Sequence, residues 1–259
     1  MNYNNKTITI TFGDQAENHK GMQQIGALSK SGFTYEDLVK FKDRLETENC
    51  ECKLVNLNDY VETKMEVETA GVLVIKNGVN KLLENIGRNV NELFEEQNNL
   101  DVDKKALMYG RVVNKHARYN LCFSDFTQEP DYKNGLGRVI AFNDVPLTNH
   151  IRQQLNEYFG KKALNLQAEG NYYYDINKCG IGWHSDLERR KVIAIRLGEA
   201  MPLYFNWFHK SKPIGNKIQI NLEHGDMYIM SEKAVGTDGC KRSIPVLRHA
   251  TGCDKYTKL

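Results

Sequence analysis

The residues best suited to chemistry are a histidine and an aspartate one residue apart, His184-Ser185-Asp186, and a much later histidine, His249. On a strand, residues two apart point to the same face, so His184 and Asp186 can address one ion together. Two imidazoles and one carboxylate on one side of a metal leave the opposite positions open, as in the facial triad of non-haem Fe(II) oxygenases. The pattern therefore predicts a redox metal site.

Three histidines after Asp186 compete for the third ligand position: His209, His224 and His249. His209 ends a strand-like run, and His224 lies at a turn. We favour His249, because the interval after Asp186 leaves room for several strands and a return to the same site. A structural zinc ion is disfavoured, since three N/O ligands without a thiolate make an open site. Beyond the metal ligands we assign no catalytic residue.

Other potential ligands have simpler interpretations. His19 has no companion at ligand spacing, so we expect a capping or surface role. Cys50 and Cys52 alternate in a strand-like run and are interpreted as half-buried core residues. The six cysteines are scattered without a CxxC pair, which is not the pattern of a secreted disulfide scaffold.

The elements that must position the triad change in character along the chain. Hydrophobic periodicity predicts helices over 18–29, 34–48, 81–97 and 147–159, and early strands over 7–12, 51–57, 71–75, 108–114 and 117–123. From residue 164 onward it predicts short strands separated by Gly and Asn turns, over 166–174, 181–186, 191–197, 202–208, 217–222, 226–231, 245–250 and 254–258. Eight short strands after helices favour an α+β fold, a double-stranded β-helix (jelly roll) with supporting helices.

Charge is unevenly distributed. Residues 1–70 carry 8 Lys/Arg against 12 Asp/Glu, and residues 71–259 carry 27 against 21. We interpret this boundary as a domain division: residues 1–66 form a small N-terminal β-α-α-β (α/β) extension of unknown role, and residues 70–259 form the jelly-roll domain. A modestly basic main domain tolerates a polyanionic substrate without identifying one.

The sequence lacks an 18-residue apolar run and a basic-then-apolar beginning. We therefore expect a monomeric cytoplasmic or nuclear protein that does not associate with membranes.

A second polar pattern precedes the triad. Asn171 and Tyr173 share a strand face, so both can donate to one carboxylate of an organic acid. The complete order is Asn171-x-Tyr173, His184-x-Asp186-x-Glu188, a strand with Leu197-Gly198, the run Gly225-Asp226-Met227-Tyr228-Ile229-Met230-Ser231, and finally His249. Over residues 70–259 this order resembles the AlkB-like branch of the Fe(II)/2-oxoglutarate dioxygenases.

The resemblance implies that His184, Asp186 and His249 ligate Fe(II), and that Asn171 and Tyr173 help to hold 2-oxoglutarate. The implied reaction consumes 2-oxoglutarate and O2, hydroxylates or oxidatively demethylates a substrate, and releases succinate and CO2. The protein positions the metal ligands, excludes water from the site and orients the substrate.

The end of the chain departs from the family, which places two arginines in its last strand. Here the last predicted strand carries Lys255 and Lys258, the natural candidates to neutralise the distal carboxylate of 2-oxoglutarate, as a late lysine does in prolyl hydroxylases. Arg196, on the predicted central strand, is the alternative, and Arg248 is the third.

The substrate stays open. The segment with Tyr109, Arg118 and Tyr119 resembles the basic, aromatic lid of the family, and Trp183 and Glu188 flank the triad. These residues suit a nucleic-acid base, whereas the missing arginines favour a protein side chain or a small molecule. Residues 188–191 are interpreted as a solvated turn, and the polar insert 231–243 as either a substrate rim or a mobile loop. A non-catalytic jelly-roll binding module is the remaining alternative.

Overall fold

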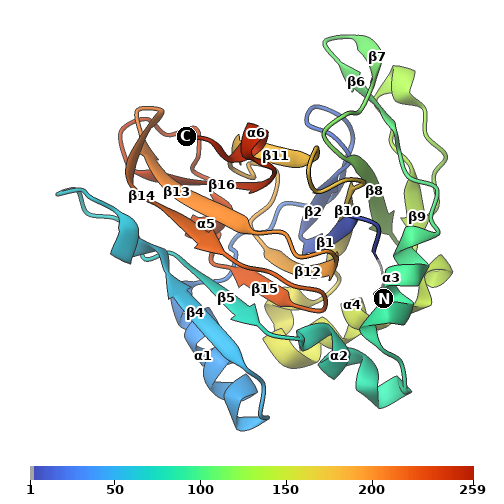
Figure 1. Ribbon diagram of the computed structural model, residues 1–259, viewed down its shortest axis with the longest axis horizontal. Helices are drawn as coiled ribbons and strands as arrows, with labels where there is room; N and C mark the ends of the chain where they lie inside the picture. Colours follow the sequence, from blue (N-terminus) through green and yellow to red (C-terminus); the bar gives the residue numbers. More distant parts are fainter. Residues whose placement is uncertain (1–2) are drawn as a thin grey trace.

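The computed structural model describes residues 3–259, which form a mixed α+β structure with many more strands than helices (Figure 1). The predicted α+β class is confirmed. The α-helices are α1 Tyr35–Thr47, α2 Gly78–Leu83, α3 Val90–Asn98, α4 Pro146–Phe159, α5 Glu232–Val235 and α6 Asp254–Thr257. The strands are β1 Thr7–Gly13, β2 Gln15–Glu17, β3 Gln24–Gly26, β4 Cys52–Asn56, β5 Gly71–Ile75, β6 Lys105–Met108, β7 Arg111–Asn114, β8 Tyr119–Ser124, β9 Val139–Ala141, β10 Gln167–Tyr173, β11 Gly180–His184, β12 Val192–Gly198, β13 Leu203–His209, β14 Lys212–Ile220, β15 Met227–Met230 and β16 Val246–Gly252.

Two sheets hold most of these strands. The large sheet has eight strands in the order β4-β5-β15-β12-β1-β10-β8-β9, and the small sheet has four in the order β11-β16-β13-β14. Neighbours are antiparallel except for the parallel β8–β9 pair. Buried side chains of both sheets, among them Phe205, Trp207 and Tyr228, pack in one hydrophobic cluster. The small sheet therefore lies over one face of the large sheet.

Within the extension predicted over 1–66, the described residues 3–66 do not form a separate unit. β1 lies inside the large sheet, paired with β10 on one side and with β12 on the other, and β4 pairs with β5 at the same sheet's edge. The charge boundary misled the prediction, because net charge reports on the solvated surface whereas strand pairing is decided by buried side chains and backbone. The N-terminal strand is therefore part of the scaffold that carries the site.

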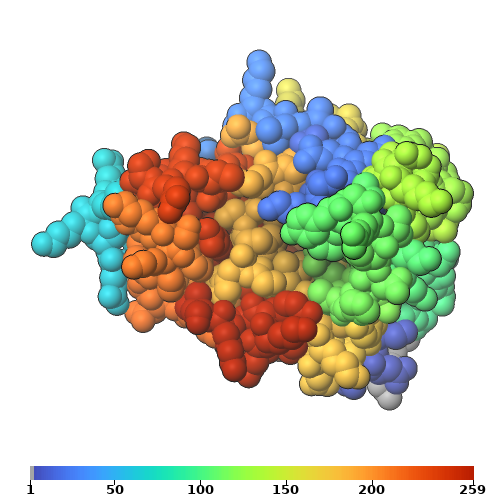
Figure 2. Space-filling model, turned by 90° about the horizontal axis from the view of Figure 1, so that it is seen from above, coloured from blue at the N-terminus to red at the C-terminus, as the bar shows by residue number. Residues whose placement is uncertain are grey.

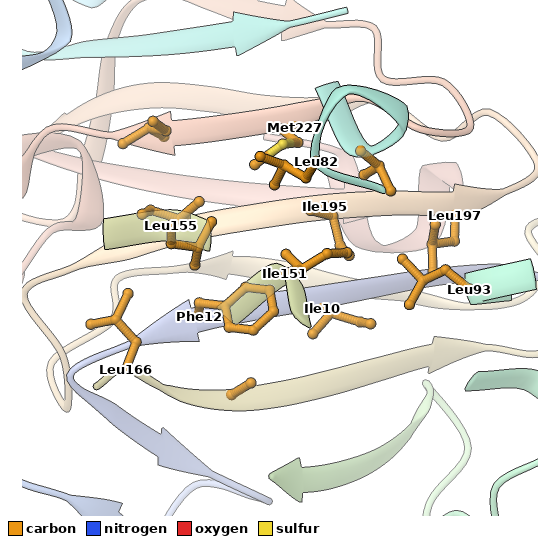
Figure 3. Close-up of a cluster of buried hydrophobic side chains, with 14 of the residues drawn as sticks. Ile10, Phe12, Leu82, Leu93, Ile151, Leu155, Leu166, Ile195, Leu197 and Met227 are labelled. Carbon is orange, nitrogen blue, oxygen red and sulfur yellow. The ribbon is translucent and has the colours of Figure 1, made fainter. Parts of the chain in front are cut away.

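The alternating sequence of β1 reflects two different environments, a hydrophobic core on one face and a cavity on the other. Ile10 and Phe12 point toward the helices and pack with Leu155 of α4 in the main core (Figure 3). Each such buried aliphatic or aromatic side chain contributes about 1.5–3 kcal/mol. Thr9 and Thr11 point to the opposite face, where they line a cavity between the sheets.

The clearest predicted helices are confirmed. α1 begins with a capping box, in which Thr34 Oγ1 accepts a hydrogen bond from the backbone N of Asp37 and the Asp37 carboxylate accepts one from the backbone N of Thr34. α4 starts at Pro146 and ends before Gly160. The helix predicted over 81–97 is divided into α2 and α3, with Gly87 at a positive φ of 65° between them.

Two predicted elements are wrong. Residues 18–29 form no helix but part of the β2–β3 hairpin, because Gly21 and Gly26 adopt positive φ angles of 86° and 94° that end regular helical geometry. Residues 254–258 form no strand, since Gly252, at φ 107°, ends β16 and the chain then folds into α6. The segment expected to close the sheet thus lies outside it.

The longest helices of the described residues are α4, with 14 residues, and α1, with 13. Crossing a bilayer takes about 20 apolar residues in a helix. Within residues 3–259, none of the helices has the length and apolar character to span a membrane.

Candidate metal centre

The three predicted metal ligands lie together at the end of the small sheet. His184 of β11 and His249 of β16 are direct cross-strand partners, with ring centroids 4.2 Å apart. Asp186 follows just after β11, and its Oδ1 lies 3.4 Å from His184 Nε2 and 3.6 Å from His249 Nε2. One donor atom from each side chain lies within 4.8 Å of the other two, a spacing that suits a single ion. Residues 3–259 contain no second cluster of this kind.

His184 is oriented to bind an ion through Nε2, and His249 is held in its neutral form. His184 Nδ1 lies 2.8 Å from the carbonyl oxygen of Gly182. Because a carbonyl oxygen can only accept, Nδ1 carries the proton, and the Nε2 lone pair is left for a metal. Burial and the neighbouring His184 lower the pKa of His249, which favours the neutral, ligating form.

The carboxylate of Asp186 presents its two oxygens to different partners. Burial opposes its charge, but the two histidines and Arg189 outweigh that effect and hold the pKa of Asp186 well below its ordinary value. Oδ1 faces both imidazoles, whereas Oδ2 lies 3.8 Å from Arg189 Nε. The arrangement favours coordination of an ion through Oδ1 alone.

The other potential ligands do not join the triad. His224 Nδ1 accepts a hydrogen bond from the backbone N of Gly198 at 2.9 Å, and His209 ends β13 outside the cluster. His19, for which a capping or surface role was expected, is half-buried, lines the cavity in front of the triad and is not part of the metal cluster. The Cys50/Cys52 pair is half-buried as expected, and burial raises the pKa of Cys52 to about 11.

A cavity of about 520 Å³ opens in front of the triad. In Figure 2, N-terminal (blue), β6–β7 (green) and C-terminal (red) segments border the orange segment that carries β11. The polar wall comes from β1 (Thr9, Thr11), the β2–β3 hairpin (Gln15, Glu17, His19, Lys20, Gln24), the start of β8 (Arg118), β10 (Glu169, Asn171, Tyr173), the turn after the triad (Glu188, Arg189), β12 (Arg196) and β15 (Tyr228). Strands from the N-terminal and C-terminal parts of the chain, β1 and β16, therefore line the same cavity.

Asn171, Thr9 and Arg196 form a row across three adjacent strands of the cavity floor. Thr9 is the direct partner of Asn171 in β10 and of Arg196 in β12, so the three side chains share one face. Arg196 is only 1% exposed, and its Nη1 donates to Thr9 Oγ1 at 2.8 Å. Its Nε is buried without a hydrogen-bond partner among the residues described. A buried guanidinium with a free donor is a receptor for an anion.

The other cations weighed for this role lie off the cavity wall. Lys255 is exposed, with its ammonium 5.4 Å from the ring centroid of Tyr256, and Lys258 is also exposed. Arg248 lies over the ring of Phe208, at 4.7 Å from its centroid. Of the four candidates, Arg196 is the one that lines the cavity.

The two residues expected to hold an organic acid both reach the cavity. Asn171 Oδ1 accepts hydrogen bonds from Arg118 Nε at 2.5 Å and Asn120 Nδ2 at 2.9 Å, and its Nδ2 donates to Glu169 Oε1 at 3.0 Å. One amide N–H is thus left for a ligand. Tyr173 is fully buried, and burial raises the pKa of its phenol, which therefore remains a neutral donor.

Two of the five expected substrate contacts, Arg118 and Glu188, line the cavity. Burial and the neighbouring Asp186 raise the pKa of Glu188. Both side chains are charged, so the part of the wall nearest the triad is polar.

The three aromatic candidates lie elsewhere. Tyr109 is 99% exposed at the tip of the β6–β7 hairpin. Tyr119 stacks on Tyr174, with ring centroids 4.9 Å apart. Trp183 donates from Nε1 to the carbonyl oxygen of Lys258 at 2.9 Å. None of the three lines the cavity.

Sequence reasoning missed a buried ion pair beneath the triad. Arg189 Nη2 lies 2.5 Å from Glu169 Oε2, and the two side chains are 5% and 7% exposed. Residues 188–191 therefore do not form the solvated turn that four consecutive charges suggested. The available signal was Glu169 itself, which shares a strand face with Asn171 and so had to point into the cavity.

A protein of Acanthamoeba polyphaga mimivirus, described as uncharacterized, is 51% identical to this chain over 256 residues, which is 98% of either protein. The chain belongs to the family of this mimivirus protein. The match covers nearly the full length of both proteins, so it includes the N-terminal segment as well as the strands that carry the triad. In the fold, β1 of that segment is likewise part of the large sheet. No family model matches the sequence.

Proposed function

We propose that the protein is an AlkB-like dioxygenase that depends on Fe(II) and 2-oxoglutarate. The observation that carries the proposal is one cavity lined both by the His184-Asp186-His249 triad and by Arg196, a buried guanidinium whose Nε has no hydrogen-bond partner within residues 3–259. A metal site beside an anion receptor suits an ion and an organic acid bound together.

The donor set fits Fe(II). Two neutral imidazoles and one carboxylate oxygen leave coordination positions open toward the cavity, whereas structural zinc sites are closed and tend to use thiolates. Fe(II) with 2-oxoglutarate and O2 supplies the oxidation, in which 2-oxoglutarate yields succinate and CO2 and one oxygen atom enters a substrate C–H bond. The Gly182 carbonyl orients His184, and Arg189 keeps the second oxygen of Asp186 turned away from the imidazoles.

The strand arrangement supports a jelly roll. Strands β10-β1-β12-β15 of the large sheet and β11-β16-β13-β14 of the small sheet give two facing groups of four antiparallel strands with a common core. In this proposal the eighth strand of the roll is β1, from the N-terminal end, in place of residues 254–258.

The co-substrate is held by the cavity floor. Arg196 pairs with the distal carboxylate of 2-oxoglutarate, which satisfies the free Nε and neutralises a charge that leaves water. Tyr173 and the remaining N–H of Asn171 are the neutral donors on the same wall. Arg118, on the same cavity wall, orients Asn171 through its hydrogen bond to Oδ1.

Apolar residues such as Leu28, Leu187 and Met230 also line the cavity, but its charged residues favour a polar substrate. Enzymes that act on bases stack the flipped base between aromatic side chains. The aromatic candidates lie off the wall, whereas Glu17, Lys20, Arg118 and Glu188 line it. We therefore propose a protein side chain or a polar small molecule as the substrate, with a nucleic-acid base as the competing class.

The deciding experiment adds 2-oxoglutarate to the anaerobic Fe(II) protein and follows the visible absorption that develops when both bind. Air is then admitted and succinate is quantified with amino acids, peptides, single-stranded DNA, duplex DNA and RNA, with Asp186→Ala as the control. We expect absorption and succinate in the unaltered protein alone. Fe(II) and 2-oxoglutarate binding without succinate formation would instead indicate a binding module, and failure to bind either would refute the proposal. Stimulation by polynucleotides alone would reverse the choice of substrate class.

A further inference from the structure

The insert 231–243 does not form a rim of the cavity but lies behind the triad. It begins with α5, which Ser231 caps, and Lys233 holds the following loop together. The Lys233 ammonium is 4% exposed and donates to Asp238 Oδ2 at 2.5 Å and to the carbonyl oxygen of Pro245 at 2.9 Å. A buried ammonium that links two points of a loop gives this insert one defined shape.

This insert touches the triad segment through its backbone. The backbone N of Asp186 donates to the carbonyl oxygen of Val235 at 3.1 Å. On the other side, Ser185 Oγ donates to the carbonyl oxygen of Leu247 at 2.8 Å, two residues before His249. The residue between His184 and Asp186 is therefore held between the insert and the strand that carries the third ligand.

Gly236 and Gly239 make this contact possible. A Cβ at Gly239 would lie 2.4 Å from Ser185 Oγ and 2.5 Å from Ser185 Cβ, and a Cβ at Gly236 would lie 2.8 Å from Ser185 Cβ. Gly236 also has a φ of 88°, which strains other residues, but the φ of Gly239 lies outside the left-handed region. At Gly239, the closest obstacle to a larger residue is thus the Ser185 side chain, and the Gly236 carbonyl oxygen is next at 3.0 Å.

We infer that Gly239 is a positioning residue for the metal centre: its missing side chain lets the insert press against Ser185, and this contact sets the separation of His184 and Asp186. The inference rests on the proposed function, since it assumes that the triad binds a metal. Ser185 cannot move away from a Cβ at Gly239 without moving its two neighbours, because they adjoin it in the chain. Groups that orient metal ligands typically change metal affinity by about 10–100-fold when altered.

The test measures Co(II) affinity by the visible absorption of the bound ion, together with thermal unfolding of the metal-free protein. Gly239→Ala should weaken Co(II) binding by about tenfold or more. Adding Ser185→Gly removes the two atoms nearest the new methyl group and leaves the Gly236 carbonyl oxygen at 3.0 Å, so the double variant should bind within about threefold of Ser185→Gly alone. Adding Ser185→Ala keeps the Cβ and should not rescue binding. Lys241→Ala, in the exposed part of the same insert, is the control and should bind as the unaltered protein does.

The outcomes separate this inference from the proposed function. If the unaltered protein binds Co(II) and Gly239→Ala binds it equally well, the inference is wrong and the proposed metal site stands. If the unaltered protein binds no Co(II), the metal assignment fails and the inference falls with it. Should Gly239→Ala not fold, the double variant carries the test: binding close to that of Ser185→Gly supports the inference, and much weaker binding overturns it.

Discussion

Replacing Arg196 by methionine should stabilise the metal-free protein and at the same time abolish co-substrate binding. Arg196 is 1% exposed, makes a hydrogen bond of 2.8 Å to the neutral Thr9 hydroxyl, and has a buried Nε without a partner. Replacing even a buried ion pair by apolar side chains of similar size can stabilise a protein by about 1–4 kcal/mol. The lost hydrogen bond costs about 1 kcal/mol. We therefore expect a net gain of about 0–3 kcal/mol in the free energy of unfolding.

The same substitution should remove the stabilisation that 2-oxoglutarate provides. A ligand present at 100 times its Kd stabilises the folded state by about 2.7 kcal/mol. For a chain of this size each kcal/mol raises Tm by about 2–4 °C, so 2-oxoglutarate should raise the Tm of the unaltered protein by about 5–10 °C. With Arg196→Met the rise should vanish, because the carboxylate would enter a buried apolar site unpaired.

Thermal unfolding with Mn(II), with and without 2-oxoglutarate, measures both effects without turnover. Lys255→Met is the matched control: it also exchanges a cation for methionine, but at an exposed position off the cavity wall. If Lys255→Met loses the Tm rise and Arg196→Met keeps it, the anion receptor lies at the end of the chain and the reasoning about the buried guanidinium is wrong.

Three further substitutions test the centre and its support. His184→Ala and Asp186→Ala should each abolish Co(II) binding and succinate formation, and undiminished binding in either variant would remove that residue from the ligand set. Glu169→Gln removes one carboxylate from Arg189, which also contacts Glu188 at 2.8 Å, and should lower the free energy of unfolding by about 1.5–3 kcal/mol in urea titrations; a loss below about 1 kcal/mol would mean that Glu188 alone satisfies Arg189. Burial lowers the pKa of Lys115 from 10.5 to about 8, so between these values the unfolded chain holds a proton that the folded protein has lost, and stability from this group rises with pH. The free energy of unfolding of the unaltered protein relative to Lys115→Met should therefore increase from pH 8 to pH 10, and a constant difference would contradict the lowered pKa.

The triad could be predicted from the sequence because its geometry is largely local. His184 and Asp186 are two residues apart near a strand, and the period-2 rule alone gives them a common side. Choosing His249 over His209 and His224 depended on strand count, and the β11–β16 register, in which His184 faces His249 directly, agrees with that choice. Periodicity was sufficient for His184 and Asp186, whereas the third ligand required the number of intervening strands as well.

The place of β1 could not be predicted in the same way. Alternation of Thr and Ile shows that a strand has two different faces, but it does not identify the neighbouring strands. β1 pairs with β10 and β12, more than 150 residues later in the chain, and no local signal encodes that distance. The same limit hid the Glu169–Arg189 pair, whose members lie on different elements.

In the proposed function, the position of β1 also accounts for the departure from the AlkB-like pattern at the end of the chain. With residues 254–257 folded as α6, the gap between β10 and β12 is filled by a strand that presents Thr9 and Thr11, and neither can neutralise a carboxylate. The positive charge comes instead from Arg196 on the next strand, directly opposite Thr9 and bonded to it. The cation at the cavity floor is therefore retained, but it is supplied by β12 instead of by the last strand of the chain. A search for a cation in the last strand of the sequence would not find Arg196. Its role becomes visible only in the folded sheet, where β1 takes the place expected for residues 254–258.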